Sequence, residues 1–361
     1  MNKISTKHFM FFIIATSTIA LRTYSSVFIN YGGRDTWIIS VIASTIIFFY
    51  FSFLIKTCNT TNTYDFDTIT CNSTSTFIGS CLKLMFSLGL FLSALESCSV
   101  VSSSIHTNYF LDTPTWYCLL FIIIPAGYVI SKSLNPIIIL TIITITLVLV
   151  GDLILMLLVS KYLNFNYLLP LFNSGFSYSK WICLLLIIGS LSSISITLPY
   201  LRYLDKKASL LKHSKIAIVF CTIIITFSFL SAIAFFGPEM ALNFFYPEFV
   251  AAQRVQIASF LEFGELFYIF RSVCMWFIKY ILSSYGIIIL YKDKIKDKKL
   301  FIFFYSLIMF TVSFIFTENQ YFLFSSLKLL QIINIFIFIF IPIISFLIFC
   351  FKHKKDIGKV K

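Results

Sequence analysis

The chain has 361 residues, of which 59% are hydrophobic and 12% are charged, and its mean hydropathy is +0.93. Soluble globular chains are about 45–50% apolar and about 25% charged, so this composition excludes a soluble enzyme, a nucleic-acid-binding domain and a disulfide-stapled secreted module. One membrane span takes about 20 apolar residues, which leaves room for about ten spans. The formal net charge is +13. In a membrane protein, such an excess of Lys and Arg can reflect the orientation of the spans, and this explanation has to be considered first.

Ten apolar runs predict ten transmembrane helices, because a helix satisfies its own backbone groups inside lipid. We expect an all-α integral membrane protein with a single polytopic membrane domain over residues 1–361. The polar stretch 56–76 is rich in Thr and Asn and predicts a loop. The connection 237–261 either lies in the membrane interface or re-enters the membrane. The predicted spans are 8–30, 37–55, 77–105, 116–131, 137–159, 179–200, 214–236, 262–290, 300–316 and 326–351.

The distribution of positive charge predicts the orientation of these spans. With the N-terminus inside, nineteen of the 28 Lys and Arg residues fall on the inner connections and the two tails. Five fall on the outer connections, and the remaining four lie within spans. Because inner loops are enriched in Lys and Arg, both termini are expected to be cytoplasmic. The basic groups beside the bilayer then indicate topology and contacts with anionic lipids, and no nucleic-acid partner is expected.

A few charged residues fall at bilayer depth, where each costs about 2.5–3.5 kcal/mol on insertion scales and marks a site or a pair. Glu96 lies near the middle of the third span, and we expect a functional or pairing role for it. Asp152 is a partner either for Arg22 or for Lys279. Arg271 lies two turns inside the eighth span and requires a partner.

Two further acidic residues fall at the outer end of the eighth span. Glu262 and Glu265 are three residues apart and share one helical face. They are either part of a site or solvated carboxylates that the helix N-terminus favours.

Small and polar residues interrupt the first and sixth spans, in the stretches 15–20 and 189–195. Transporters built as inverted repeats break these two helices at mid-membrane, and the freed backbone groups bind the carboxylate and amine of an amino-acid-like ligand. Close helix packing by small residues is the alternative explanation. The candidate ligand-binding residues are Thr18, Ala20, Glu96, Gly189, Ser190 and Ser193.

Motifs of soluble enzymes are missing from the sequence, including the nucleophile elbow, the zinc-protease helix, the phosphate-binding loop and the dinucleotide fingerprint. The nine cysteines show no metal-ligand spacing. We therefore expect no catalytic residues, no enzymatic activity, no cofactor and no metal.

Two short motifs stand at the ends of predicted spans. Gly33-Arg34-Asp35-Thr36-Trp37, between the first two spans, resembles the Gly-Arg-Asp-x-Trp signature of the B subunits of spore germination receptors. The stretch that runs from Tyr246-Pro247 to Glu265 resembles the family's Pro … Arg … Phe-Leu-Glu-Arg-x-Glu sequence before span 8. The residues that match these motifs are Gly33, Arg34, Asp35, Trp37, Pro247, Arg254, Glu262 and Glu265.

The resemblance implies a relative of the amino acid–polyamine–organocation transporters, with a five-plus-five inverted repeat. Such subunits recognise small nutrient germinants, often amino acids, in the inner membrane of a dormant spore. They work with an A subunit and a C-subunit lipoprotein. Two departures stand out, because Phe263 replaces the Arg of the family's Glu-Arg-x-Glu motif and the expected glycine-rich break reads Thr18-Ile19-Ala20.

The leading hypothesis is a germinant-sensing membrane subunit that binds a small amino-acid-like ligand in a mid-membrane pocket and signals to partner subunits. The alternative is an ion-coupled secondary transporter of amino acids or amines, in which Asp152 or Glu96 is the proton-coupling carboxylate. A third interpretation is a purely structural membrane subunit with a vestigial pocket.

Overall fold

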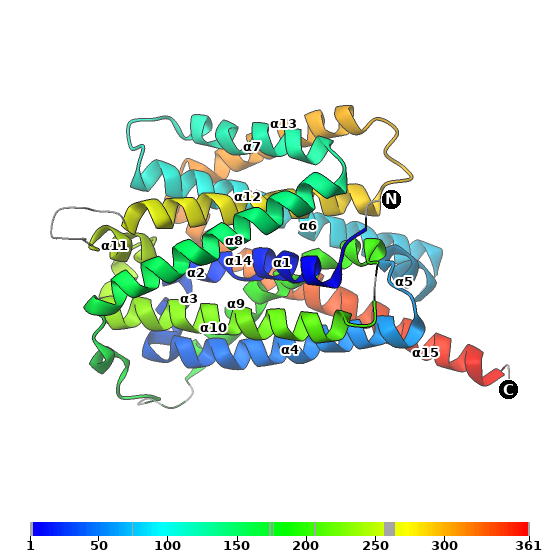
Figure 1. Ribbon diagram of the computed structural model, residues 1–361, viewed down its shortest axis with the longest axis horizontal. Coiled ribbons are helices and arrows are strands. Elements are labelled where there is room, and N and C mark those ends of the chain that lie inside the picture. The colour runs from blue at the N-terminus through cyan, green and yellow to red at the C-terminus, as the bar shows by residue number, and fades with distance from the viewer. Residues whose placement is uncertain are drawn as a thin grey trace.

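The computed structural model describes residues 3–73, 75–172, 175, 177–205, 207–255 and 264–359, and in this part of the chain it is all-helical, with no β-strand. The long helices form one bundle, and both chain termini lie at the same end of it (Figure 1). We call this the terminal end and the other the opposite end. Among the described residues, eight helical segments are long and apolar enough to cross a membrane. The prediction of an all-α membrane protein is confirmed.

The first apolar run does not form one helix. It consists of α1 (Thr6–Ser17), α2 (Ile19–Thr23) and α3 (Ser26–Gly32). The Ser17 and Thr18 hydroxyls donate to the carbonyls of Ile13 and Ile14, at 2.7 and 2.9 Å. Such bonds to the preceding turn bend helices, and the helix is interrupted at Thr18.

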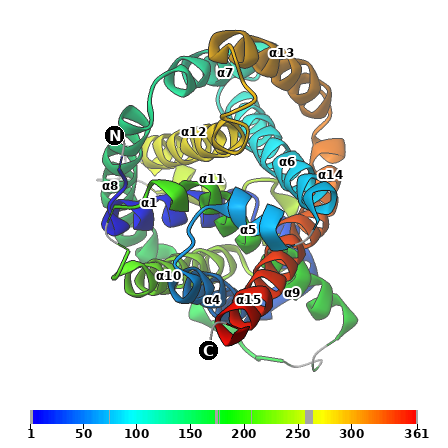
Figure 2. The same cartoon turned by 90° about the vertical axis from the view of Figure 1, so that its right-hand side faces the viewer.

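The sixth span also changes its geometry in mid-membrane. The α-helix α9 (Tyr178–Leu191) continues as the 3₁₀ helix η4 (Ser192–Tyr203). Runs of 3₁₀ helix rarely exceed three or four residues, and this one has 12. Helix α1 lies inside the ring of longer helices (Figure 2) and packs against η4. The two interrupted spans therefore meet in the centre of the bundle.

Long helices surround this centre. Helix α12 packs against α6 and α8, α4 packs against α9 and α10, and α7 and α13 lie side by side at the edge of the bundle (Figures 1 and 2). Their bounds are α4 (Thr36–Thr61), α6 (Thr76–Asn108), α7 (Thr115–Ser131), α8 (Leu134–Val159), α10 (Leu210–Phe236), α12 (Gly264–Leu290), α13 (Lys298–Thr317), α14 (Gln320–Ile335), the π-helix η6 (Phe336–Phe340) and α15 (Ile341–Lys359).

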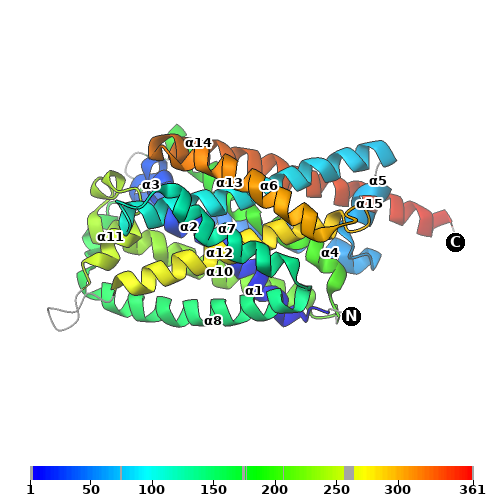
Figure 3. The ribbon, with the colours of Figure 1, turned by 90° about the horizontal axis from the view of Figure 1, so that it is seen from above.

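The prediction of a loop over 56–76 is wrong for most of that stretch. Helix α4 continues to Thr61, and a short helix α5 (Phe66–Ser73) follows. Phe66 is buried, with its ring centroid 4.4 Å from that of Phe86. Lys83 pairs with Asp67 at 2.7 Å. The burial of Phe66 and Ile69, together with this ion pair, holds the helix at the terminal end (Figure 3), although its Thr- and Asn-rich composition predicts a loop.

The connection between α10 and α12 re-enters the bundle. After the 3₁₀ turn η5 (Met240–Asn243), the helix α11 (Pro247–Gln253) begins with proline in its first turn, where the missing N–H has no helical partner to lose. Pro247, Glu248 and Phe249 are buried, and α11 packs against α12 and α10. The position of Glu248 inside the bundle shapes the site described below.

Candidate ligand-binding site

The interrupted spans are joined by a hydrogen bond. The Ser193 hydroxyl donates to the Thr16 carbonyl at 2.8 Å and to the Ser190 carbonyl at 2.6 Å. Thr18, Ser190 and Ser193 are each about 1% exposed. Among the described residues, the Ser190 hydroxyl has no hydrogen-bond partner. The structure therefore brings the two small, polar stretches together and leaves one buried hydroxyl free.

A charged pair lies among uncharged polar groups in the same bundle. The Lys279 ammonium lies 2.8 Å from the Glu96 carboxylate, and both residues are buried. The Tyr24 hydroxyl also donates to Glu96. The Gln331 amide donates to Tyr24 at 2.9 Å and to Glu96 at 3.3 Å. This Glu96 network, formed by Tyr24, Glu96, Lys279 and Gln331, combines residues of α6, α12 and α14 with the residue that follows α2.

An aromatic wall adjoins the Glu96 network. The Trp276 ring stacks on Tyr24 with 6.2 Å between centroids, and the Lys279 ammonium lies 4.9 Å from the Trp276 centroid. Trp276 also donates from its indole nitrogen to the Thr23 hydroxyl at 3.0 Å. A desolvated cation over a Trp ring is stabilised by about 2 kcal/mol. The wall therefore fixes both the ammonium group and the chain that follows the break in span 1.

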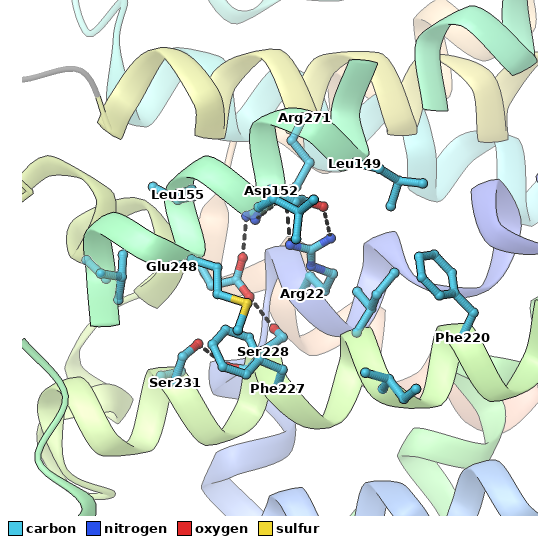
Figure 4. A pocket seen from close by; sticks show the side chains of 17 residues that line it. Arg22, Leu149, Asp152, Leu155, Phe220, Phe227, Ser228, Ser231, Glu248 and Arg271 are labelled. Carbon is cyan, nitrogen blue, oxygen red and sulfur yellow. Dashed lines mark hydrogen bonds and ion pairs between the residues drawn. The ribbon is translucent and has the colours of Figure 1, made fainter. Parts of the chain in front are cut away.

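A second charged cluster, the Asp152 network, joins five elements (Figure 4). Arg22 donates to both oxygens of Asp152 at 2.6 and 2.9 Å, and Arg271 donates to Asp152 at 3.3 Å. Arg271 and the Ser228 hydroxyl both donate to Glu248. The network is the set Arg22, Asp152, Ser228, Glu248 and Arg271, and its two positive and two negative charges balance.

The structure decides the pairings that the sequence left open. Asp152 pairs with Arg22, and Lys279 pairs with Glu96 instead. Arg271 forms ion pairs with two carboxylates, those of Asp152 and Glu248. Sequence reasoning missed four residues of these networks. Glu248 was hidden in a connection, and Tyr24 resembles the many other tyrosines. Ser228 and Gln331 carry no charge, although a polar side chain inside an apolar run was a usable signal.

Three consecutive residues connect the two networks. Arg22 belongs to the Asp152 network, Tyr24 belongs to the Glu96 network, and Thr23 accepts a hydrogen bond from Trp276 between them. This segment follows the break at Thr18 by only a few residues. Any rearrangement of the broken span must therefore alter both networks.

Gly189 links span 6 to the Glu96 network. A Cβ atom at this position would overlap the carbonyl oxygen of Gln331 on α14. A glycine is needed here because the two helix backbones approach each other directly. The remaining candidate on span 1, Ala20, is buried in the same core.

Gly189→Ala is expected to push α9 and α14 apart and to lower the free energy of unfolding by about 1–3 kcal/mol, the usual range for overpacking. Gly127→Ala on α7 is the matched control, because a Cβ there would lie 3.6 Å from its nearest neighbour, the Ser306 hydroxyl. The control should be neutral or slightly stabilising. Thermal unfolding of the purified variants in detergent measures the difference, and equal midpoints would contradict the close approach.

The first family motif lies at the opposite end of the bundle and holds the connection before span 6. Arg34 donates to the Leu169 carbonyl at 2.7 Å. The Asp35 carboxylate pairs with Lys180 at 2.7 Å and accepts the backbone N–H of Phe172 at 3.0 Å. Gly33 and Asp35 belong to the 3₁₀ turn η1 (Gly33–Asp35), and Trp37 stands in the first turn of α4. These residues organise a connection between spans.

The second family motif surrounds α11. Pro247 begins that helix, and Arg254 at its end lies 5.7 Å from the Phe236 ring centroid. The Glu265 carbonyl accepts a hydrogen bond from Tyr109 at 3.2 Å. Glu262 lies outside the described residues, so its place beside Glu265 on one helical face stays a prediction.

Two cavities adjoin the networks. One, of about 540 Å³, lies at the opposite end, and its lining includes Asn30, Phe324 and Lys328. The Phe324 ring packs edge-on against Tyr24, with 6.4 Å between centroids. One aromatic ring thus adjoins both this cavity and the Glu96 network. The other cavity, of about 300 Å³, lies between α8 and α10 and contains the Asp152 network at its base (Figure 4).

Comparison with known proteins identifies the family. A family model described as spore germination protein matches residues 3–321, which include Arg22, Glu96, Asp152, Glu248 and Lys279. No curated protein matches the chain. The match covers most of the chain and agrees with the resemblance of the short motifs. This multi-pass membrane protein therefore belongs to the family of spore germination proteins.

Proposed function

We propose that this protein is a germinant-sensing membrane subunit, which binds an amino-acid-like ligand between the interrupted spans and the Glu96 network. The observation that carries this proposal is the buried Glu96–Lys279 pair at 2.8 Å, in a bundle whose two broken spans meet. A zwitterion matches such a pair, because its ammonium can pair with Glu96 and its carboxylate with Lys279. One buried ion pair becomes two, and the site gains no net charge.

The cavity at the opposite end supports an entry route for this ligand. Its volume of about 540 Å³ accommodates an amino acid, and Asn30 and Lys328 offer polar groups. Phe324 lies between this cavity and Tyr24, so its side chain must move before a ligand reaches Glu96. In the orientation that the positive charges predict, this cavity faces away from the cytoplasm, and both termini are cytoplasmic in the inner membrane of the spore.

Signalling would use the segment Arg22–Thr23–Tyr24. A ligand that replaces the contact between Glu96 and Lys279 changes what holds Tyr24, and it favours one arrangement of the broken span over another. A ligand can shift such an equilibrium only by its differential affinity for the two arrangements. The partners that receive the change are, in this proposal, the A subunit and the C-subunit lipoprotein of the receptor.

Glu96→Gln is expected to raise the germinant concentration for half-maximal germination by about tenfold or more, because a hydrogen bond to a charged group contributes about 1.5–3 kcal/mol. Ser193→Leu should have a similar or larger effect, because the larger leucine side chain would fill the junction of the two broken spans, where Ser193 contacts Thr16. Germination of spores that carry each variant is measured against a dose series of amino acids, and protein levels in the spore membrane are measured alongside.

Glu318→Gln is the matched control, since Glu318 is exposed at the end of α13 and should leave the dose response unchanged. An unchanged dose response for both Glu96→Gln and Ser193→Leu would refute the pocket. Uptake of labelled amino acids by liposomes that contain this chain alone would instead identify an ion-coupled transporter.

A further inference from the structure

The cavity between α8 and α10 opens sideways. Its rim includes Leu153, Met156 and Ile223, which are 62%, 41% and 61% exposed on two membrane-spanning helices. A rim of exposed apolar side chains on such helices faces lipid chains. The volume of about 300 Å³ is about twice that of the roughly 150 Å³ engineered apolar cavity that takes up benzene. The groove therefore has room for a hydrocarbon segment that enters from the bilayer.

The base of the groove is polar but carries no net charge. Both oxygens of Asp152 and both oxygens of Glu248 already accept hydrogen bonds. Among the described residues, the two groups of the cluster without a hydrogen-bond partner, the Nε–H groups of Arg22 and Arg271, are enclosed by protein and do not face the groove. An added anion would leave the balanced cluster with a net charge. The base of the groove is therefore suited to an uncharged polar group.

The depth of the cluster narrows the choice of this uncharged group. Asp152 lies seven residues before the end of α8, and Arg271 lies seven residues after the start of α12. At 1.5 Å per residue, both lie about 10 Å inside the opposite end of the bundle. The polar region on each side of a bilayer is about 5–8 Å thick, beyond a hydrocarbon core of about 30 Å. The cluster is thus close to the boundary where the ester carbonyls of glycerolipids lie.

We propose that this groove binds one acyl chain of a bilayer glycerolipid, whose uncharged ester group lies against the charge-balanced cluster at the base of the groove. The chain packs between α8 and α10. Because Arg22 lies four residues after the break at Thr18, an occupied groove also constrains the broken span. This lipid site is separate from the ligand site of the proposed function.

The full-length protein is reconstituted in phosphatidylcholine that carries a photoactivatable diazirine on its acyl chain, and the labelled peptides are mapped by mass spectrometry. We expect labelling of the groove segments of α8 and α10 to be saturable and several-fold stronger than labelling of the exposed face of α13. Ser231→Phe places a ring in the groove and should reduce this labelling several-fold. Val219→Phe, half-exposed on the same helix and outside the groove lining, is the matched control and should not.

Competition with unlabelled lipids tests, without any substitution, whether the group at the base of the groove is uncharged. Phosphatidylcholine and phosphatidylglycerol should compete equally, because the groove recognises the shared ester and not the headgroup charge. Preferential displacement by phosphatidylglycerol or by a fatty acid would identify an anion site and overturn the proposal. Groove labelling no stronger than that of α13, or unchanged in a folded Ser231→Phe variant, would overturn it as well.

Discussion

Lys279→Met is expected to lower the free energy of unfolding by about 3–5 kcal/mol, the cost of leaving one member of a buried ion pair without its partner. The variant keeps the length of the side chain but removes the ammonium that lies 2.8 Å from Glu96. The hydrogen bonds from Tyr24 and Gln331 remain, but neither donor carries a charge. Chemical or thermal unfolding of the purified protein in detergent measures the loss.

The double variant Glu96→Gln/Lys279→Met provides the test of this explanation. Removing both charges eliminates the uncompensated carboxylate, so the double variant should be more stable than Lys279→Met alone. A coupling energy between the two sites follows from the cycle of single and double variants. If the losses of the two single substitutions simply add, the pair is not the source of the effect.

Arg271→Met is expected to have an effect of similar size in the Asp152 network, about 3–5 kcal/mol or the loss of folded protein. Arg271 donates to both Asp152 and Glu248, so its removal leaves Glu248 with the Ser228 hydroxyl alone. Arg271→Lys should recover only part of the loss, because an ammonium is a point charge and lacks the planar fork that reaches two carboxylates. Yield of monodisperse protein and its unfolding midpoint provide the measurement.

Arg254→Met is the control for this substitution. Arg254 is exposed and lies over the Phe236 ring, 5.7 Å from its centroid. An exposed cation–π contact contributes about 0.5–1 kcal/mol, so the control should lose no more than that. Equal stabilities of Arg271→Met and Arg254→Met would show that the buried network does not stabilise the fold.

The Asp152 network and the Glu96 network both restrain the segment that follows the break at Thr18, because each holds one residue of that segment. Arg22 and Tyr24 are two positions apart, yet their partners lie on different helices: Asp152 on α8 and Glu96 on α6. The segment after the Thr18 break is therefore restrained from two sides. The ligand of the proposed function would act on one side and the proposed lipid chain on the other, so both would bias the same broken span.

The sequence was sufficient for properties that depend on local composition. Hydropathy predicted an all-α membrane protein, short motifs around Arg34 and Pro247 predicted the family, and both are confirmed. The same low charge content made Glu96, Asp152 and Arg271 visible as buried groups. Local composition gave a wrong prediction at 56–76, where the Thr and Asn content predicted a loop. The stretch is mostly helical, and Phe66 packs against Phe86, which lies outside the stretch.

Only the tertiary structure decided which charges meet. Arg22 and Asp152 are 130 positions apart, and Glu96 and Lys279 are 183 apart. Spacing along the chain cannot distinguish Arg22 from Lys279 as the partner of Asp152. Insertion into lipid depends on the apolar area of each segment by itself, whereas ion pairing depends on the packing of helices that are remote in sequence. The sequence by itself therefore determined that buried charges exist, and the packing of α2, α6, α8, α11 and α12 decided how they are neutralised.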